Sequence, residues 1–190
     1  MRERSVRWYL FGAQAAIVWG SPRLSADVDV TADLDRVALT DYIDTMRRSG
    51  FDVVFGDAEF VESTRVIPFV HRATRMPLDI VLAGSGLEEE FLKRAISVVL
   101  SGSTVPVISP EDLIITKILA GRPKDIEDIR GVINERRSSL DVARIRAVLK
   151  HLERALDQSD LLPSFEREWR KKKVPAAGAV VSRTRAKKKP

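Results

Sequence analysis

The sequence of 190 residues contains no cysteine and only two histidines, His71 and His151. Without cysteine, a disulfide framework, a thiolate zinc site and a cysteine nucleophile are all excluded. With two histidines, we expect neither a histidine-built metal centre nor a Ser-His-Asp triad. The chemistry of this chain therefore has to rest mainly on carboxylates.

Long apolar runs are missing as well. No segment approaches the roughly 20 residues that a membrane-spanning helix needs. Residues 10–19 superficially resemble the apolar part of a signal peptide, but Gln14 interrupts them and Glu3 lies in the charged segment before them. With 44% hydrophobic and 31% charged residues, the composition is that of a globular protein. We expect a cytoplasmic location and no membrane partner.

Positive charge is concentrated at the C-terminal end. The chain has 32 Lys and Arg against 27 Asp and Glu, a formal net charge of +5. Nine of the basic residues and none of the acidic ones lie in residues 170–190, so residues 1–169 carry 23 basic and 27 acidic residues, a net charge of −4. Residues 171–190 are expected to be a basic disordered tail, which either binds a polyanion or serves solubility alone.

Hydrophobic periodicity predicts strands and helices in the first half of the chain and helices in the second. Strands are expected over residues 7–11, 26–31, 51–55, 64–71, 76–82 and 104–108. Helices are expected over residues 13–19, 35–49, 87–97, 110–120, 124–136 and 141–156. The prediction is an α+β fold, a mixed sheet flanked by helices. Its core comprises residues 1–108, and a helical part, residues 109–170, packs on the core.

Three aspartates stand out on the predicted strands. Asp27 and Asp29 are two residues apart, so both side chains project from the same face of one strand. Neighbouring carboxylates repel each other unless a cation lies between them, and Mg²⁺ favours oxygen ligands. Asp79 is the only acid in the apolar strand expected over residues 76–82. If the two strands are neighbours, the three carboxylates can hold two Mg²⁺ ions for phosphoryl transfer; a solvated face or a turn is the alternative.

Two blocks of sequence resemble a known superfamily. Gly12 lies at a predicted strand-to-helix junction, where it is either a simple turn or a place for phosphate oxygens on backbone N–H groups. Residues 11–30, which end in Gly-Ser-Pro-Arg-Leu-Ser-Ala-Asp-Val-Asp-Val, closely resemble the signature of the nucleotidyltransferase superfamily, most of all the AbiEii-type toxins and their small relatives. Residues 108–129 are similar to the helix pair that supplies a lysine and then a Lys/Arg-Asp-x-x-Asp in those proteins. The resemblance covers residues 8–133.

The resemblance implies a polymerase beta-like fold and a role for each matching residue. Asp27, Asp29 and Asp79 would be the metal ligands, and Asp79 would also take the proton of the attacking hydroxyl. The implied nucleotide-binding residues are Gly12, Ala13, Arg23, Lys117 and Asp125. Ala13 departs from the pattern, because glycine or serine usually follows the first glycine. Lys117 can alternatively lie on the solvated side of its helix, and Arg23 can simply cap a turn.

The function implied is transfer of a nucleoside monophosphate from an NTP to a hydroxyl, with Mg²⁺ as the cofactor. By resemblance to the toxins, the acceptor is RNA, such as the 3′ end of a tRNA, or a protein, and a cognate antitoxin restrains the activity in a toxin–antitoxin or phage-defence system. Two alternatives stay open. One is a nucleotide-binding or antitoxin-like module that keeps the fold without catalysis, for which Ala13 argues. The other is adenylylation of a small molecule such as an antibiotic.

Overall fold

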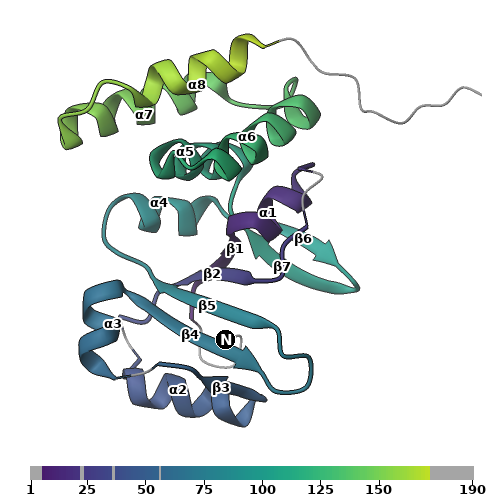
Figure 1. Ribbon diagram of the computed structural model, residues 1–190, viewed down its shortest axis with the longest axis vertical. Coiled ribbons are helices and arrows are strands. Elements are labelled where there is room, and N and C mark those ends of the chain that lie inside the picture. Colours follow the sequence, from purple (N-terminus) through teal and green to yellow (C-terminus); the bar gives the residue numbers. More distant parts are fainter. Residues whose placement is uncertain (1–5, 22–23, 36, 56, 172–190) are drawn as a thin grey trace, which may run out of the picture.

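The structure, a computed structural model, describes residues 6–21, 24–35, 37–55 and 57–171. Within these ranges the chain forms one seven-stranded sheet in the order β3-β4-β5-β2-β1-β7-β6 (Figure 1). Across the sheet the strands are β3 (Phe51–Val53), β4 (Val66–His71), β5 (Pro77–Leu82), β2 (Val28–Ala32), β1 (Trp8–Phe11), β7 (Ser103–Val107) and β6 (Ile96–Leu100). β2 runs parallel to β5 and β1 runs parallel to β7, whereas the other neighbours are antiparallel.

Helices surround the sheet and then stack beyond it. In chain order they are α1 (Gly12–Val18), α2 (Leu39–Arg48), α3 (Ala58–Thr64), α4 (Leu87–Arg94), α5 (Pro110–Ala120), α6 (Pro123–Arg136), α7 (Val142–Leu156) and α8 (Leu161–Arg170). α5 and α6 form a middle layer, with α1 and the sheet on one side and α7 and α8 on the other (Figure 1). The mixed sheet with a C-terminal helical layer confirms the predicted α+β class. The division at residue 108 stays a prediction, and residues 172–190 of the predicted tail lie outside the described residues.

Local sequence signals explain where α5 and α7 begin and end. The Ser109 hydroxyl accepts a hydrogen bond from the Asp112 N–H at 3.1 Å, and a proline follows it at the first helical position. Gly121 ends the helix in the left-handed conformation, with φ of 63°. Asp141 caps α7 in the same way, because its carboxylate accepts a hydrogen bond from the Arg144 N–H at 2.9 Å. Both helices occur where the sequence predicts them.

Three elements are not predicted by the periodicity: α3, β6 and α8. The predicted helix over residues 87–97 ends early, because β-branched residues such as Ile96 and Val98 pair with β7. The short helix α3 follows Asp57, whose carboxylate accepts a hydrogen bond from the Phe60 N–H at 2.8 Å. A capping aspartate before a single amphipathic turn was the available signal for α3.

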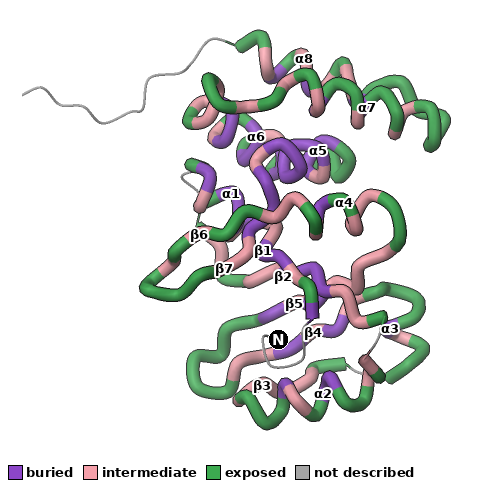
Figure 2. The backbone as a smooth tube through the Cα atoms, turned by 180° about the vertical axis from the view of Figure 1, so that it is seen from behind, coloured by how far each residue is buried: buried purple, intermediate pink, exposed green. Residues whose placement is uncertain are grey.

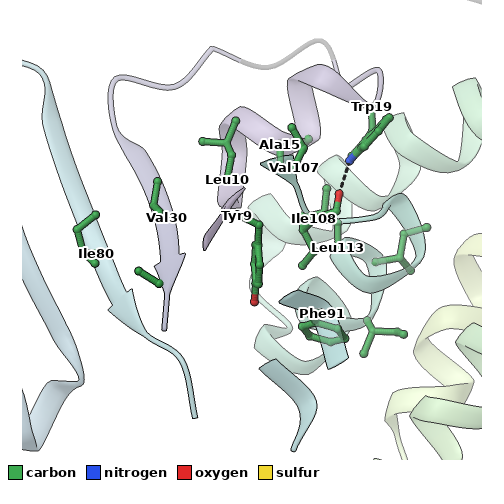
Figure 3. Packing of buried hydrophobic residues seen from close by; sticks show 14 of the residues in the cluster. Tyr9, Leu10, Ala15, Trp19, Val30, Ile80, Phe91, Val107, Ile108 and Leu113 are labelled. Carbon is green, nitrogen blue, oxygen red and sulfur yellow. Dashed lines mark hydrogen bonds between the residues drawn. The ribbon is translucent and has the colours of Figure 1, made fainter. Parts of the chain in front are cut away.

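The core is continuous from the sheet into the helical layer. Tyr9 on β1, Phe91 on α4 and Leu113 on α5 are almost fully buried in one cluster (Figure 3). The Trp19 indole N–H donates to the carbonyl oxygen of Ile108 at 2.8 Å and so joins the end of α1 to the start of α5. α5 is buried along most of its length, whereas α7 and α8 expose their outer faces (Figure 2). No helix among the described residues is long and apolar enough to cross a membrane.

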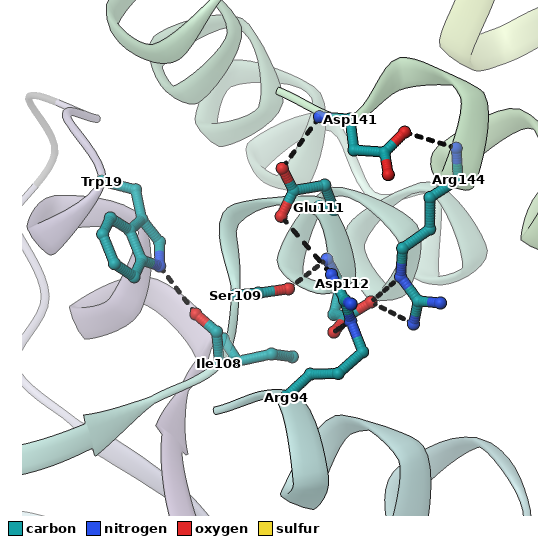
Figure 4. A network of polar contacts seen from close by, with 8 residues as sticks. All are labelled: Trp19, Arg94, Ile108, Ser109, Glu111, Asp112, Asp141 and Arg144. Atoms are coloured by element: carbon teal, nitrogen blue, oxygen red, sulfur yellow. Dashed lines mark hydrogen bonds and ion pairs between the residues drawn. The ribbon is translucent and has the colours of Figure 1, made fainter. Parts of the chain in front are cut away.

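A network of buried charges also ties the helices together. Asp112 on α5 has no exposed surface and binds two guanidinium groups, Arg94 of α4 at 3.1 Å and Arg144 of α7 at 2.9 Å (Figure 4). Its neighbour Glu111 accepts a hydrogen bond from the Asp141 N–H at 3.0 Å. These contacts fix the orientation of α5, the helix on which Lys117 lies.

Candidate active site

The carboxylates of Asp29 and Asp79 come from adjacent strands. β2 and β5 are parallel neighbours, and Asp29 and Asp79 are partner positions in their register, so both side chains project from one face of the sheet. Asp27 lies directly before β2, is exposed, and accepts a hydrogen bond from the Ser25 hydroxyl. The structure confirms that the strands of Asp29 and Asp79 are neighbours, on which convergence of the three carboxylates depends.

Gly12 makes room for the Asp29 carboxylate. The chain turns from β1 into α1 at Gly12, with φ of +65°, and Phe11 is the register partner of Asp29. A Cβ on Gly12 would lie 1.9 Å from Asp29 Oδ2, so no other residue fits without moving that carboxylate. The backbone N–H of Ala13 donates a hydrogen bond to Asp29. This N–H therefore holds a carboxylate, and phosphate binding by Gly12 and Ala13 stays a prediction.

The acids of the site disfavour one another's charge. Burial raises the pKa of Asp29, the charges of Asp27 and Asp79 raise it further, and Lys117 and the Ala13 N–H partly oppose this. Burial also raises the pKa of Asp79, and the charge of Asp27 adds to the effect. Negative charges crowded on one sheet face are an environment that a bound cation would stabilise.

The donor set fits a hard divalent cation. All three predicted ligands offer only carboxylate oxygens, which Mg²⁺ prefers, and two of them are register partners. Among the described residues, no three side chains of Asp, Glu or His are gathered closely enough to enclose an ion as they stand. The Asp27 carboxylate accepts a hydrogen bond from Ser25. Asp29 and Asp79 are the pair placed side by side that could hold an ion, and the part of Asp27 in the site stays a prediction.

Lys117 lies at the centre of a second cluster, between α5 and α6. Its ammonium binds Asp125 Oδ1 at 3.2 Å and Asp128 Oδ2 at 2.7 Å, and the Lys117 side chain is only 7% exposed. Both aspartates are buried, and Ser21 Oγ donates to Asp128 Oδ1 at 2.9 Å. The solvated position that the sequence left open for Lys117 is therefore wrong, whereas its contact with phosphate stays a prediction.

Arg122 is a residue of this region that sequence reasoning missed. It lies before the first turn of α6, and its Nε and Nη2 donate to the two Asp125 oxygens at 2.6 and 3.2 Å. Its side chain is 59% exposed. The available signal was its place between Lys117 and Asp125, in the middle of the second block of the resemblance. Arg23, also predicted to bind the nucleotide, lies outside the described residues.

An apolar hollow lies on the face of the sheet opposite to Asp29 and Asp79. It encloses about 580 Å³ and is lined by residues such as Leu10, Val28, Val30 and Leu78. Val28 and Val30 alternate with Asp29 along β2, so their side chains project from the opposite face. The hollow is therefore separate from the carboxylates.

Solved structures with a similar fold include two of ANT(2″)-Ia and one of a nucleotidyltransferase-like protein. The solution structure of the antibiotic-resistance factor ANT(2″)-Ia is similar at a TM-score of 0.54 and 16% identity, covering 82% of this chain and 88% of that one. A crystal structure of ANT(2″)-Ia with adenylyl-2″-tobramycin gives a TM-score of 0.53 and 18% identity, over 82% and 91% of the chains. An antigenic nucleotidyltransferase-like protein from Paracoccidioides brasiliensis gives 0.53 and 17%, over 87% and 86%.

The sequence assigns the chain more narrowly. Residues 2–174 match the family described as "Nucleotidyltransferase of unknown function (DUF6036)", and the chain belongs to this family. No curated protein matches the sequence. The resemblance to the nucleotidyltransferase superfamily is thereby confirmed, and the match includes both sequence blocks on which it rested.

Proposed function

We propose that this protein is a Mg²⁺-dependent nucleotidyltransferase that moves a nucleoside monophosphate from an NTP to a hydroxyl group and releases pyrophosphate. The observation that carries the proposal is the register of β2 and β5, which puts Asp29 and Asp79 side by side with Asp27 one residue before the strand. Membership of a nucleotidyltransferase family supports it. Among the described residues neither Asp29 nor Asp79 forms an ion pair, and a purely structural role would not require two such acids side by side on one sheet face.

The chemistry follows from these residues. Asp27, Asp29 and Asp79 would hold the Mg²⁺, which when bound offsets phosphate charge and makes a hydroxyl easier to deprotonate. Asp79 would accept the proton of the acceptor hydroxyl. The hydroxyl oxygen then forms a bond to the α-phosphorus while the bond between that phosphorus and the bridging oxygen breaks. Pyrophosphate leaves with the electron pair of the broken bond.

The acceptor and the biological system belong to the proposal as well. The likeness of the two sequence blocks to AbiEii-type toxins favours RNA, such as a tRNA 3′ end, or a protein hydroxyl, with an antitoxin partner and a role in phage defence. The nine basic residues within residues 170–190 favour RNA, because lysine and arginine clusters bind phosphates without sequence preference. Deleting residues 174–190 should weaken RNA binding and leave NTP binding unchanged.

A small hydroxyl-bearing molecule is the second candidate acceptor. The observation that favours it is the similarity to ANT(2″)-Ia, which was solved with adenylyl-2″-tobramycin. The same incubation can test both candidates if total RNA and tobramycin are offered separately.

The experiment is incubation of the full chain with each α-labelled NTP, Mg²⁺ and one acceptor. We expect label transfer that is lost in Asp29→Asn and on addition of EDTA. The matched control is Asp44→Asn, which removes an exposed acid paired with Arg47 on α2 and should transfer label at the wild-type rate. Transfer by Asp29→Asn at the wild-type rate would contradict the proposal. Tight NTP binding without transfer to any acceptor would favour the non-catalytic module.

A further inference from the structure

Two cations near the break between α5 and α6, Lys117 and Arg122, differ in how far their side chains are exposed. Lys117 is 7% exposed and its ammonium contacts Asp125 and Asp128, both of them buried. Arg122 is 59% exposed although it also binds Asp125. A phosphate has to approach from solvent, so it meets the guanidinium before it can reach the ammonium. Moving Lys117 to a phosphate would also leave two buried carboxylates without this partner.

The guanidinium of Arg122 is held in a fixed orientation. Nε and Nη2 donate to opposite oxygens of Asp125, which occupies one edge of the planar group. Within the described part of the chain, Nη1 makes no hydrogen bond. A planar guanidinium can bind a carboxylate along one edge and an anion along another, which a point-charged ammonium cannot do. Preorganisation by Asp125 lowers the entropy that Arg122 would lose on binding an anion.

Arg122 is also electrostatically connected to the carboxylate site. Its hydrogen bond to Asp125 raises the pKa of Arg122, and the negative charges of Asp125, Asp29 and Asp128 raise it further, against the effect of burial. Asp29 is thus close enough to act on the guanidinium without an ion pair between them.

We propose that Arg122 binds the phosphates of the nucleotide, and that Lys117 serves the fold by neutralising Asp125 and Asp128. This assignment rests on the proposed function and deepens it. It differs from the roles implied by the sequence resemblance, in which Lys117 reaches the phosphates.

The test uses calorimetric titration of the full chain with Mg²⁺ and inorganic tripolyphosphate, a probe without a base, and then with the four NTPs. Losing one charge-assisted contact should weaken binding about 10- to 100-fold in Arg122→Ala. Arg122→Lys should weaken binding less than Arg122→Ala, because lysine keeps the positive charge but lacks the planar guanidinium with several donors. The matched control is Lys124→Ala, an exposed cation two residues away, which should bind like wild type. A urea titration of each variant reports whether the fold is intact.

Each remaining outcome decides the question. If the wild type binds tripolyphosphate and Arg122→Ala binds it equally well, the assignment is wrong while the proposed function stands. An equal loss in Lys124→Ala would mean general charge attraction, which also overturns it. Loss of binding in Lys117→Met with an unchanged unfolding midpoint would return the phosphate role to Lys117. A wild type that binds neither tripolyphosphate nor any NTP would overturn the proposed function, and this assignment with it.

Discussion

Removing the charge of Lys117 should destabilise the protein severely. In Lys117→Met a side chain of similar length replaces the cation that lies 3.2 Å from Asp125 and 2.7 Å from Asp128. Arg122 still contacts Asp125, whereas Asp128, which also accepts a hydrogen bond from Ser21, loses the ammonium. Breaking a buried pair from one side typically costs about 3–5 kcal/mol, because the other charge stays buried. Total stabilities are about 5–15 kcal/mol, so a large share would be lost.

Equilibrium urea unfolding measures this loss. With a slope of about 2 kcal/mol per molar urea for a chain of this size, the midpoint should fall by about 2 M. The fluorescence of Trp19 is a suitable probe, because its buried indole binds the Ile108 carbonyl between α1 and α5. The control Lys124→Met removes an exposed cation and should change stability by at most about 0.5 kcal/mol.

A double variant separates lost charge from lost packing. Lys117→Met combined with Asp128→Asn also removes the negative charge that the lysine contacts, so it should regain part of the stability that the single variant loses. If Lys117→Met unfolds within about 1 kcal/mol of the wild type, the lysine is not neutralising these carboxylates, and our account of the cluster is refuted.

Three further predictions concern separate parts of the molecule. Gly12→Ala should abolish nucleotidyl transfer in the label assay, because the new Cβ would lie 1.9 Å from Asp29 Oδ2 at a φ of +65°; full activity would disprove the tight turn. Gly131→Ala should lower the free energy of unfolding by about 1–3 kcal/mol in urea, since its Cβ would lie 2.7 Å from the Ser21 Cα; unchanged stability would show that α1 and α6 can separate without cost. Burial raises the pKa of Glu168, but hydrogen bonds from Arg130 and Lys171 outweigh it and lower the pKa below 4.5. The stabilisation by Glu168 is therefore complete above pH 4.5 and is lost as the pH falls through the lowered value, so Glu168→Gln should flatten this acid dependence of the unfolding midpoint, and an identical dependence would contradict the assignment.

Local sequence signals were sufficient to place helices whose ends are marked by capping residues. The start of α5 follows from Ser109 and Pro110, and its end follows from Gly121, because each residue satisfies or tolerates the local backbone by itself. β6 shows the opposite case. Residues after Arg94 continue a helical pattern in sequence, but pairing with β7 gives their backbone groups partners in a sheet. Only a long-range partner distinguishes the two conformations, and a sequence window does not contain it.

The carboxylates of the candidate site also show what the sequence can predict and what only the folded sheet decides. The period of two predicts one strand face for Asp27 and Asp29, although the structure begins β2 at Val28. Asp79 stands out as an acid in an apolar strand, so the sequence alone could single out all three. The register that makes Asp29 and Asp79 partners depends on which strands are neighbours, and this is a property of the whole sheet.

For Lys117 and Arg122 the sequence predicts less, because their exposure depends on how the helices pack. The sequence by itself determined the order of Lys117, Arg122, Asp125 and Asp128 and a break between their two helices at residues 121–123. Only the tertiary structure decided that the lysine is buried against both acids while the arginine faces solvent. Burial depends on which side of α5 meets α6, and that packing is set by contacts with α1, α7 and α8. Charge type is thus encoded locally, whereas the water or carboxylate that each charge meets is a property of the assembled fold.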